Sequence, residues 1–92
     1  MNKYESVIIV NPNLDEAGVK ALEDKFTGLI NENGKVESID KMGKRKLAYE
    51  IKKNKEAFYV QFNFESKPEA ITELERIYRI TDDVLKFITI KK

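Results

Sequence analysis

Apolar and polar residues alternate along four segments of the chain, and a period of two residues predicts β-strands. These segments are residues 4–10, 36–51, 57–64 and 84–90. The third segment has the clearest alternation, with one face apolar and the other mostly polar. Its inward face is expected to consist of Phe58, Val60, Phe62 and Phe64.

Two further segments carry apolar residues at steps of three and four, which is the period of an amphipathic helix. The first begins after Asp15, a favourable N-cap, and we expect Gly34 to end it in the left-handed conformation. The second follows Ser66, which is expected to form a capping box with Glu69, and Pro68 suits an early helical position. The expected buried stripes are Val19, Leu22, Phe26, Leu29 and Ile30 in the first helix, and Ala70, Ile71, Leu74, Ile77 and Tyr78 in the second.

These elements follow one another in the order βαββαβ, without an internal repeat, a low-complexity tract or a linker. This order is that of the ferredoxin-like split βαβ motif, an α+β fold in which a four-stranded antiparallel sheet carries both helices on one face. Right-handed crossovers place the first and third strands in the centre of the sheet. We therefore predict a single ferredoxin-like domain over residues 1–92. Because this fold hosts many unrelated functions, it does not by itself decide the function.

The second strand changes the face of its apolar residues partway along. Val36 would point inward from an even position. Farther along, the residues expected to point inward occupy odd positions: Leu47, Tyr49 and Ile51. An odd shift requires a bulge, and Gly43 is the natural position for it. Residues 52–55 are expected to form the following turn, centred on Asn54.

The helices would cover one face of the predicted sheet and leave the other face open. The first and third strands are expected to contribute to this open face Val7, Ile9 and Tyr59. The last strand is apolar at both its even-numbered and its odd-numbered positions. Its contribution to the open face is therefore one of two pairs, Ile88 and Ile90 or Leu85 and Phe87. An exposed apolar cluster usually marks an interaction surface, so the open face predicts a protein partner.

Charge is concentrated in one stretch of a chain that is almost neutral overall. The 92 residues include 17 Lys or Arg and 16 Asp or Glu, a net charge of +1. Residues 41–55 alone contain seven of the bases and one acid, a formal charge of +6. Clustered bases release counterions when they meet phosphates, and the apolar residues between them indicate a strand rather than a disordered tail. The stretch therefore predicts an element that binds a polyanion. The alternative is a charged surface that contacts only solvent.

The absence of two residue types limits the possible chemistry. The chain has no cysteine and no histidine, which excludes zinc sites of the Cys/His kind and nucleophilic arrangements that use an imidazole base. The common catalytic arrangements are therefore missing, and an enzyme that uses carboxylates or lysines is the possibility that remains. No apolar run approaches the roughly 20 residues of a membrane span, and the start of the chain lacks a signal-peptide pattern, so we expect a cytoplasmic protein.

Other protein classes share this topology. An RNA-recognition domain stacks bases on aromatic residues of the first and third strands, but Ala57 stands where the first stacking aromatic belongs and Glu56 replaces a glycine. An acylphosphatase-like enzyme would need an anion-binding loop after the first strand, and residues 11–14 contain neither arginine nor glycine. The main alternative is a protein-binding ferredoxin-fold adaptor whose basic strand meets an acidic protein.

Several short motifs are spread along nearly the whole chain. They are Tyr4-Glu5, Asn-Pro-Asn-Leu at residues 11–14, Gly34 before Val36, and Arg79 followed by Asp-Val-Leu-Lys at residues 83–86. The most specific is Gly-Lys-Arg-Lys-Leu-Ala-Tyr-Glu-Ile at residues 43–51, which fits the pattern Gly-x-Arg-x-Leu-Ala-Tyr. Together these motifs resemble the bacterial small-subunit ribosomal protein six family.

The resemblance implies a structural constituent of the small ribosomal subunit rather than an enzyme, with a role in translation and subunit assembly and with no metal or cofactor. It also implies binding to the central domain of small-subunit ribosomal RNA, together with ribosomal protein eighteen of the same subunit. The expected contacts with RNA phosphates are Lys44, Arg45 and Lys46, with Lys3 and Lys86 as secondary ones. The expected contacts with the protein partner are Val7, Ile9, Tyr59, Ile88 and Ile90.

Overall fold

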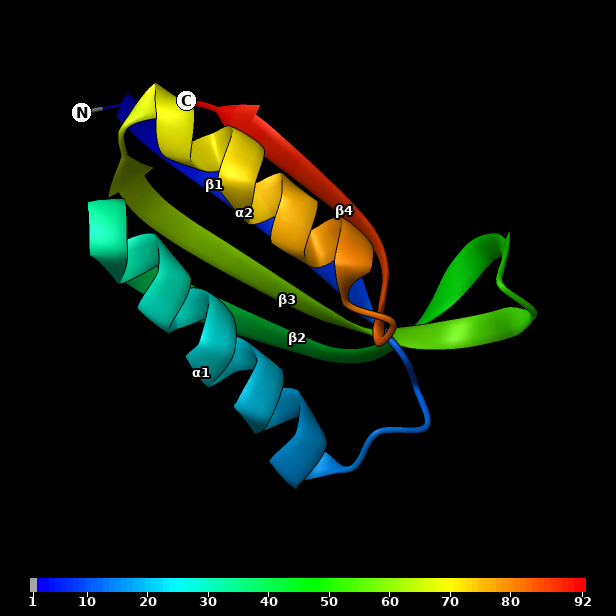
Figure 1. The fold of residues 1–92 in the computed structure, drawn as a ribbon. Helices are drawn as coiled ribbons and strands as arrows, with labels where there is room; N and C mark the ends of the chain where they lie inside the picture. Colours follow the sequence, from blue (N-terminus) through cyan, green and yellow to red (C-terminus); the bar gives the residue numbers. More distant parts are fainter. Residues whose placement is uncertain (1) are drawn as a thin grey trace.

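A computed structural model describes residues 2–92 and contains four strands and two helices (Figure 1). The elements are β1 (Asn2–Val10), α1 (Glu16–Asn33), β2 (Gly34–Ile51), β3 (Asn54–Ser66), α2 (Pro68–Ile80) and β4 (Val84–Lys91). All pairings in the sheet are antiparallel, the strand order is β2-β3-β1-β4, and both helices lie on the same face. The predicted ferredoxin-like βαββαβ fold is confirmed, with the first and third strands in the centre.

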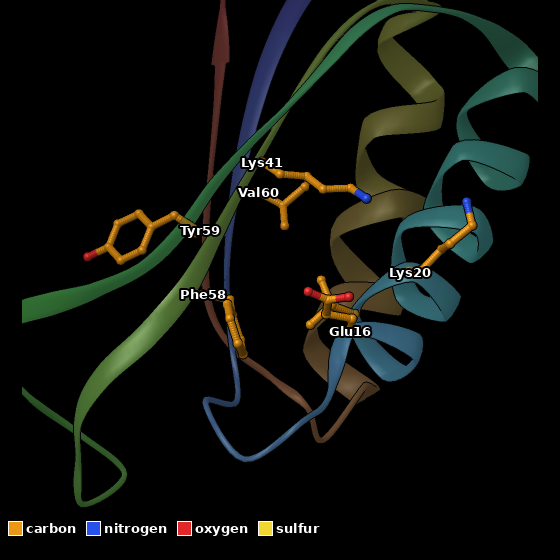
Figure 2. Close-up of a pocket in the computed structure, with 8 residues that line it drawn as sticks. Glu16, Lys20, Lys41, Phe58, Tyr59 and Val60 are labelled. Atoms are coloured by element: carbon orange, nitrogen blue, oxygen red, sulfur yellow. The ribbon is translucent and has the colours of Figure 1, made fainter.

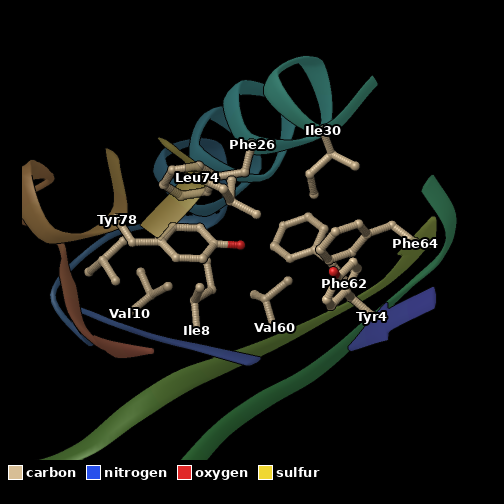
Figure 3. Packing of buried hydrophobic residues seen from close by; sticks show 11 residues of the cluster. Tyr4, Ile8, Val10, Phe26, Ile30, Val60, Phe62, Phe64, Leu74 and Tyr78 are labelled. Atoms are coloured by element: carbon tan, nitrogen blue, oxygen red, sulfur yellow. The ribbon is translucent and has the colours of Figure 1, made fainter. Parts of the chain in front are cut away.

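The hydrophobic core lies between the sheet and the helices (Figure 3). The ring of Phe26 from α1 packs edge-on against Tyr78 from α2, with 4.7 Å between ring centroids. The Phe26 ring also packs edge-on against Phe62 from β3, with 6.5 Å between ring centroids. The core sequence positions follow the predicted periods, because even-numbered residues of β1 and β3 point toward the helices. Within residues 2–92, no helix is long and apolar enough to cross a membrane.

A small polar cluster is buried inside this core. The hydroxyl oxygens of Ser6 and Tyr78 lie 3.0 Å apart, and the Ser6 hydroxyl lies 3.2 Å from that of Thr89. Because Ser6 and Tyr78 are fully buried, these hydrogen bonds replace the ones that water would make. Burial raises the pKa of Tyr78 to about 12, against the opposing effect of its hydrogen bond to Ser6.

The two ends of α1 are formed in different ways. The Asp15 carboxylate accepts a hydrogen bond of 2.8 Å from the backbone N–H of Gly18, so the predicted N-cap is confirmed. The prediction for Gly34 is wrong, because its backbone is extended (φ −176°) rather than left-handed. Glycine is required there because the chain passes close to β3: a Cβ would collide with the Glu65 carbonyl and lie 2.8 Å from the Cα of Ser66.

The start of α2 also differs from the prediction. Ser66 is the last residue of β3, and its hydroxyl donates to the carbonyl of Lys67 at 3.1 Å. The N-cap is Lys67, which makes no side-chain capping bond, and Pro68 is the first helical residue. The predicted capping box between Ser66 and Glu69 is therefore wrong. Pro68 suits the first helical position because it has no N–H to leave unsatisfied.

The pairing of β2 with β3 is irregular at three points. The register shifts after Val36, after Lys41 and after Lys46. At the second shift Met42 is the unpaired residue, and Gly43 has a φ of +76°, in the region that favours glycine. The predicted bulge at Gly43 is confirmed. The other two shifts involve no glycine, and the sequence pattern does not predict them.

The turn between β2 and β3 is tighter than expected. Lys52 and Lys53 have φ values of +48° and +68°, which is the conformation that two-residue hairpin loops require. Asn54 already belongs to β3 and pairs with Ile51, so the prediction of a turn centred on Asn54 is wrong. The strands are joined by these two lysines at the tip of the hairpin, and both are exposed.

Candidate nucleic-acid and protein interface

Beyond Gly43, β2 and β3 continue as a twisted hairpin that extends past the body of the sheet (Figure 1). We call residues 44–56 the hairpin arm. It contains six Lys or Arg and two Glu, so the excess of positive charge found in the sequence lies mainly on this element. The predicted RNA contacts Lys44, Arg45 and Lys46 are paired with β3 residues and exposed, so their backbone positions are fixed by a sheet ladder while their charges reach solvent.

The three predicted contacts do not share one side of the arm. Lys44 lies opposite Phe58, whose ring packs on the core, and the Lys44 ammonium lies 5.3 Å from that ring's centroid. Arg45 lies opposite Ala57 and therefore on the other side, where its Nε donates to the Met42 carbonyl at 3.3 Å. Since successive side chains of a strand alternate, Lys46 returns to the side of Lys44. The arm therefore carries positive charge on both of its sides.

The two secondary contacts lie at opposite ends of the sheet. Lys86 is paired with Ile9, beside the arm, and its ammonium donates a hydrogen bond of 2.7 Å to the hydroxyl of Tyr49. Lys3 is six residues from Ile9 along β1, about 20 Å away, and it forms an ion pair of 3.7 Å with Glu37. The structure brings Lys86 to the arm but keeps Lys3 apart from it.

Lys41, the first base of the cationic stretch, has a different environment. Its ammonium points toward α1 and lies 2.9 Å from the carboxylate of Glu23, whose side chain is 12% exposed. This ion pair ties β2 to α1, so Lys41 contributes to the fold and less to the charge offered to a partner. Figure 2 shows Lys41 and Val60 directed toward the helices, whereas Tyr59 points to the opposite face.

The five residues predicted to bind a protein all lie on the face opposite the helices. Ile88 and Ile90 are about half exposed, at 49% and 56%, while Val7 and Tyr59 are partly buried. Of the two pairs left open for the last strand, the structure therefore selects Ile88 and Ile90. Phe87 points the other way, with its ring 5.3 Å from that of Tyr78.

Ile9 departs from this pattern because it is only 7% exposed although no helix covers its face. The cover is the arm. A cavity of about 200 Å³ separates the two, lined on the arm by Leu47, Ala48, Tyr49 and Ile51 and on the sheet by Val7, Ile9, Tyr59, Lys86 and Ile88. The sequence pattern marks Leu47 and Ile51 as inward-facing, and both are partly buried here. The same prediction is wrong for Tyr49, which is 61% exposed and contacts Lys86 at the rim.

Known proteins of similar sequence and structure identify the family of this chain. Residues 3–91 match the profile of the family described as Ribosomal protein S6. The chain belongs to the ribosomal protein S6 family. It is 52% identical to the small ribosomal subunit protein bS6 of Clostridium beijerinckii, over 100% of this chain and 98% of that one. It is 45% identical to the bS6 protein of Heliobacterium modesticaldum, over 100% and 97% of the two chains.

A solved structure shows the same fold within the S6 family. The crystal structure of 30S ribosomal protein S6 from Thermotoga maritima has a TM-score of 0.94 and is 34% identical, and the match covers 99% of this chain and 87% of that one. The predicted family, the ferredoxin-like fold and the structural, non-enzymatic role are therefore confirmed. As members of the small subunit, S6 proteins are part of the ribonucleoprotein that carries out translation in the bacterial cytoplasm.

A cavity with mainly apolar walls lies on the other side of the arm's base (Figure 2). It measures about 380 Å³ and is lined by Glu16, Val19, Lys20, Lys41, Gly43, Phe58, Tyr59 and Val60. Its lining includes charged groups of both signs. In the described part of the chain, no three acidic side chains come together as a metal site would require.

Proposed function

We propose that this chain binds the central domain of small-subunit ribosomal RNA through the hairpin arm, in the presence of ribosomal protein eighteen bound to the open face. The observation that carries the proposal is the arm itself. Six bases against two acids stand on a paired hairpin that reaches beyond the sheet, next to an apolar strip on β4. This combination supplies a phosphate-binding element and a protein-binding element side by side.

The alternation of charge on the arm favours a particular mode of RNA binding. Lys44 and Lys46 project from one side and Arg45 from the other, so an arm lying flat on a single phosphate backbone would use only part of its charge. An arm inserted edge-on between two backbones would use both sides. Folded RNA offers such places, and phosphate contacts there recognise the shape of the RNA rather than its sequence.

The protein partner would take the strip formed by Ile88 and Ile90. These two side chains are exposed, adjacent on one face of an edge strand, and continuous with Val7 on β1. Burying these side chains removes apolar surface from water, which contributes a favourable free energy of about 25 cal/mol for each Å² buried. The partner would then stand against the same face that the arm covers at its other end.

The RNA half of the proposal is tested with the double variant Lys44→Glu/Arg45→Glu. A transcript of the central domain is titrated at several salt concentrations, with and without purified protein eighteen. We expect a loss of affinity of about tenfold to a hundredfold, and a slope of log affinity against log salt that is smaller by about 1 to 2. The matched control is Lys20→Glu/Lys25→Glu, which reverses two exposed lysines on α1 and leaves the arm intact. Equal losses in both variants would contradict binding through the arm.

The protein half is tested with Ile88→Asp, measured by calorimetry with protein eighteen. We expect association to weaken about tenfold or more, because a carboxylate would have to be desolvated in the interface. The control is Ile80→Asp at the end of α2, where the isoleucine is 62% exposed on the other side of the molecule. Circular dichroism of both variants confirms folding. Unchanged association in Ile88→Asp would place the partner elsewhere.

An adaptor that binds an acidic protein is the competing function, because the arm would attract any polyanion. The same titration with an acidic protein at matched ionic strength separates the two. Tighter binding to the acidic protein than to the transcript would favour the adaptor.

A further inference from the structure

Tyr49 and Lys86 come from opposite edges of the sheet. In the strand order β2-β3-β1-β4, Tyr49 belongs to one edge strand and Lys86 to the other. Their side chains meet because the arm twists beneath the open face, and the Lys86 ammonium donates to the Tyr49 hydroxyl at 2.7 Å. The same ammonium lies 5.4 Å from the centre of the tyrosine ring. The hydrogen bond joins two residues that are 37 positions apart in the chain.

The part of the arm that carries Tyr49 has little support from the sheet ladder. Pairing with β3 is regular from Gly43 to Lys46, opposite Glu56, and resumes only at Ile51, opposite Asn54. Residues 47–50 fall in the register shift between these pairs. The other side-chain hydrogen bonds found in the arm, from Arg45 and Asn54, reach residues two or three positions away. They shape the arm locally and do not attach it to the sheet.

The apolar contacts under the arm are loose. Ala57 and Ile9 lie on the face opposite the helices and are 0% and 7% exposed, so the arm does cover this region. However, a cavity of about 200 Å³ remains between arm and sheet, and the ring of Tyr49 is mostly exposed. An element with few buried contacts opens at low cost, so a single polar contact can control its position.

From these observations we infer that Lys86 is a positioning residue: its hydrogen bond to Tyr49 latches the hairpin arm to β4 and so fixes the direction in which the arm presents its bases. The inference rests on the proposed RNA-binding function and changes one part of it. Lys86 affects RNA through the arm, instead of contacting a phosphate as the sequence predicts. A phosphate contact by Lys86 would compete with its bond to Tyr49.

A double-mutant cycle distinguishes the two roles of Lys86. Lys86→Met removes the ammonium, and Tyr49→Phe removes only the hydroxyl that accepts its bond. We expect each single variant to weaken binding of the central-domain transcript by about threefold to tenfold, and the double variant to be no weaker than Lys86→Met alone. Additive losses, with Tyr49→Phe near wild type, would overturn the latch and restore the phosphate contact. Lys86→Arg keeps a donor and is expected to recover most of the affinity.

A second measurement tests, without RNA, whether the hydrogen bond between Lys86 and Tyr49 holds the arm in place. Amide relaxation of the free protein reports the order of residues 47–50 on the picosecond-to-nanosecond timescale. We expect Lys86→Met and Tyr49→Phe to lower the order parameters of these residues to the same extent. The control Lys3→Met removes a lysine from the far end of the same face and should leave them unchanged. Unchanged order in Lys86→Met would overturn the inference even if RNA binding were weakened. If the wild-type protein failed to bind RNA, the proposed function would fall while these order parameters still tested the latch.

Discussion

The two faces of this sheet are built from the same four strands but are held together in different ways. On the helix side, large side chains such as Phe26, Phe62 and Tyr78 are fully buried and contact one another edge-on. On the open side, the arm covers Ile9 but leaves a cavity of about 200 Å³ between arm and sheet, and Ile88 is exposed. The first face is determined by many simultaneous contacts, and the second by a few. The sparsely held face also carries the charge and the exposed apolar strip, which is where a binding surface has to remain available.

The largest expected effect follows from removing a core ring on the helix side. Phe62→Ala is expected to lower the free energy of unfolding by about 3–5 kcal/mol, because it removes a large apolar side chain and leaves a cavity. Ile88→Ala on the open face should cost well under about 1 kcal/mol. Urea denaturation of both variants measures the difference. Similar losses in the two variants would mean that the faces are equally tightly packed, against the comparison drawn from burial.

The pH dependence of stability tests whether the helix side is closed to water, because Tyr78 is buried there. Tyr78 has its pKa raised to about 12 in the folded protein by burial, whereas an unfolded tyrosine ionises near 10. The folded state therefore holds this proton more tightly. The resulting stability is complete below pH 10 and is lost as the pH rises towards 12, by at most about 3 kcal/mol.

Denaturation curves across this pH range measure the loss. The control is Tyr78→Phe, which has no phenol to ionise at this position and should lose less stability over the same interval. Other tyrosines and lysines titrate there too, so the quantity of interest is the difference between the two slopes. Equal slopes would show that Tyr78 ionises at its ordinary pKa and that its surroundings are open to water.

Sequence periodicity predicts the buried residues of the helix side well. In a regular helix or strand, the position of a residue along the element determines the face on which it lies. The alternation through β3 and the three-and-four spacing of Phe26 and Ile30 in α1 identify the core without knowledge of the fold. This relation fails where the pairing of strands is irregular. β2 shifts its register three times, and after each shift the face of every later residue changes in a way that alternation does not reveal. For this reason the exposure of Tyr49 could not be read from the sequence. Alternation places Lys44 and Arg45 on opposite sides of the strand, but it does not reveal which of the two lies on the helix side.

The errors at element boundaries have a related cause. Gly34 was expected to adopt a positive φ because many helices end that way, but its role is to let two backbones approach closely. That role depends on β3, which lies some thirty residues farther along the chain. Similarly, the basic cluster could be located as a segment, yet its contact with Lys86 depends on the arm reaching the opposite edge of the sheet. Contacts between distant segments are the part of the site that local patterns do not contain.

The smallest expected effects come from two glycines that have equally open surroundings but different backbone conformations. At both Gly43 and Gly28 an added Cβ would meet no atom within 4 Å, so substitution by alanine creates no clash. Gly43 has a φ of +76°, and alanine there should destabilise the protein by about 1 kcal/mol. Gly28 lies at an exposed position inside α1, and alanine there should stabilise it by about 1 kcal/mol.

Because the two substitutions are expected to change stability in opposite directions and neither alters packing, together they test the effect of backbone conformation alone. Urea denaturation of Gly43→Ala and Gly28→Ala measures both. Gly43 lies at the base of the arm, so its substitution should also change the order of residues 47–50, whereas Gly28→Ala should leave the arm as it is. A stabilising Gly43→Ala would mean that the chain at the base of the arm can give up its left-handed turn. In that case the arm's direction would be set by its docking against β4 rather than by the bulge from which it starts.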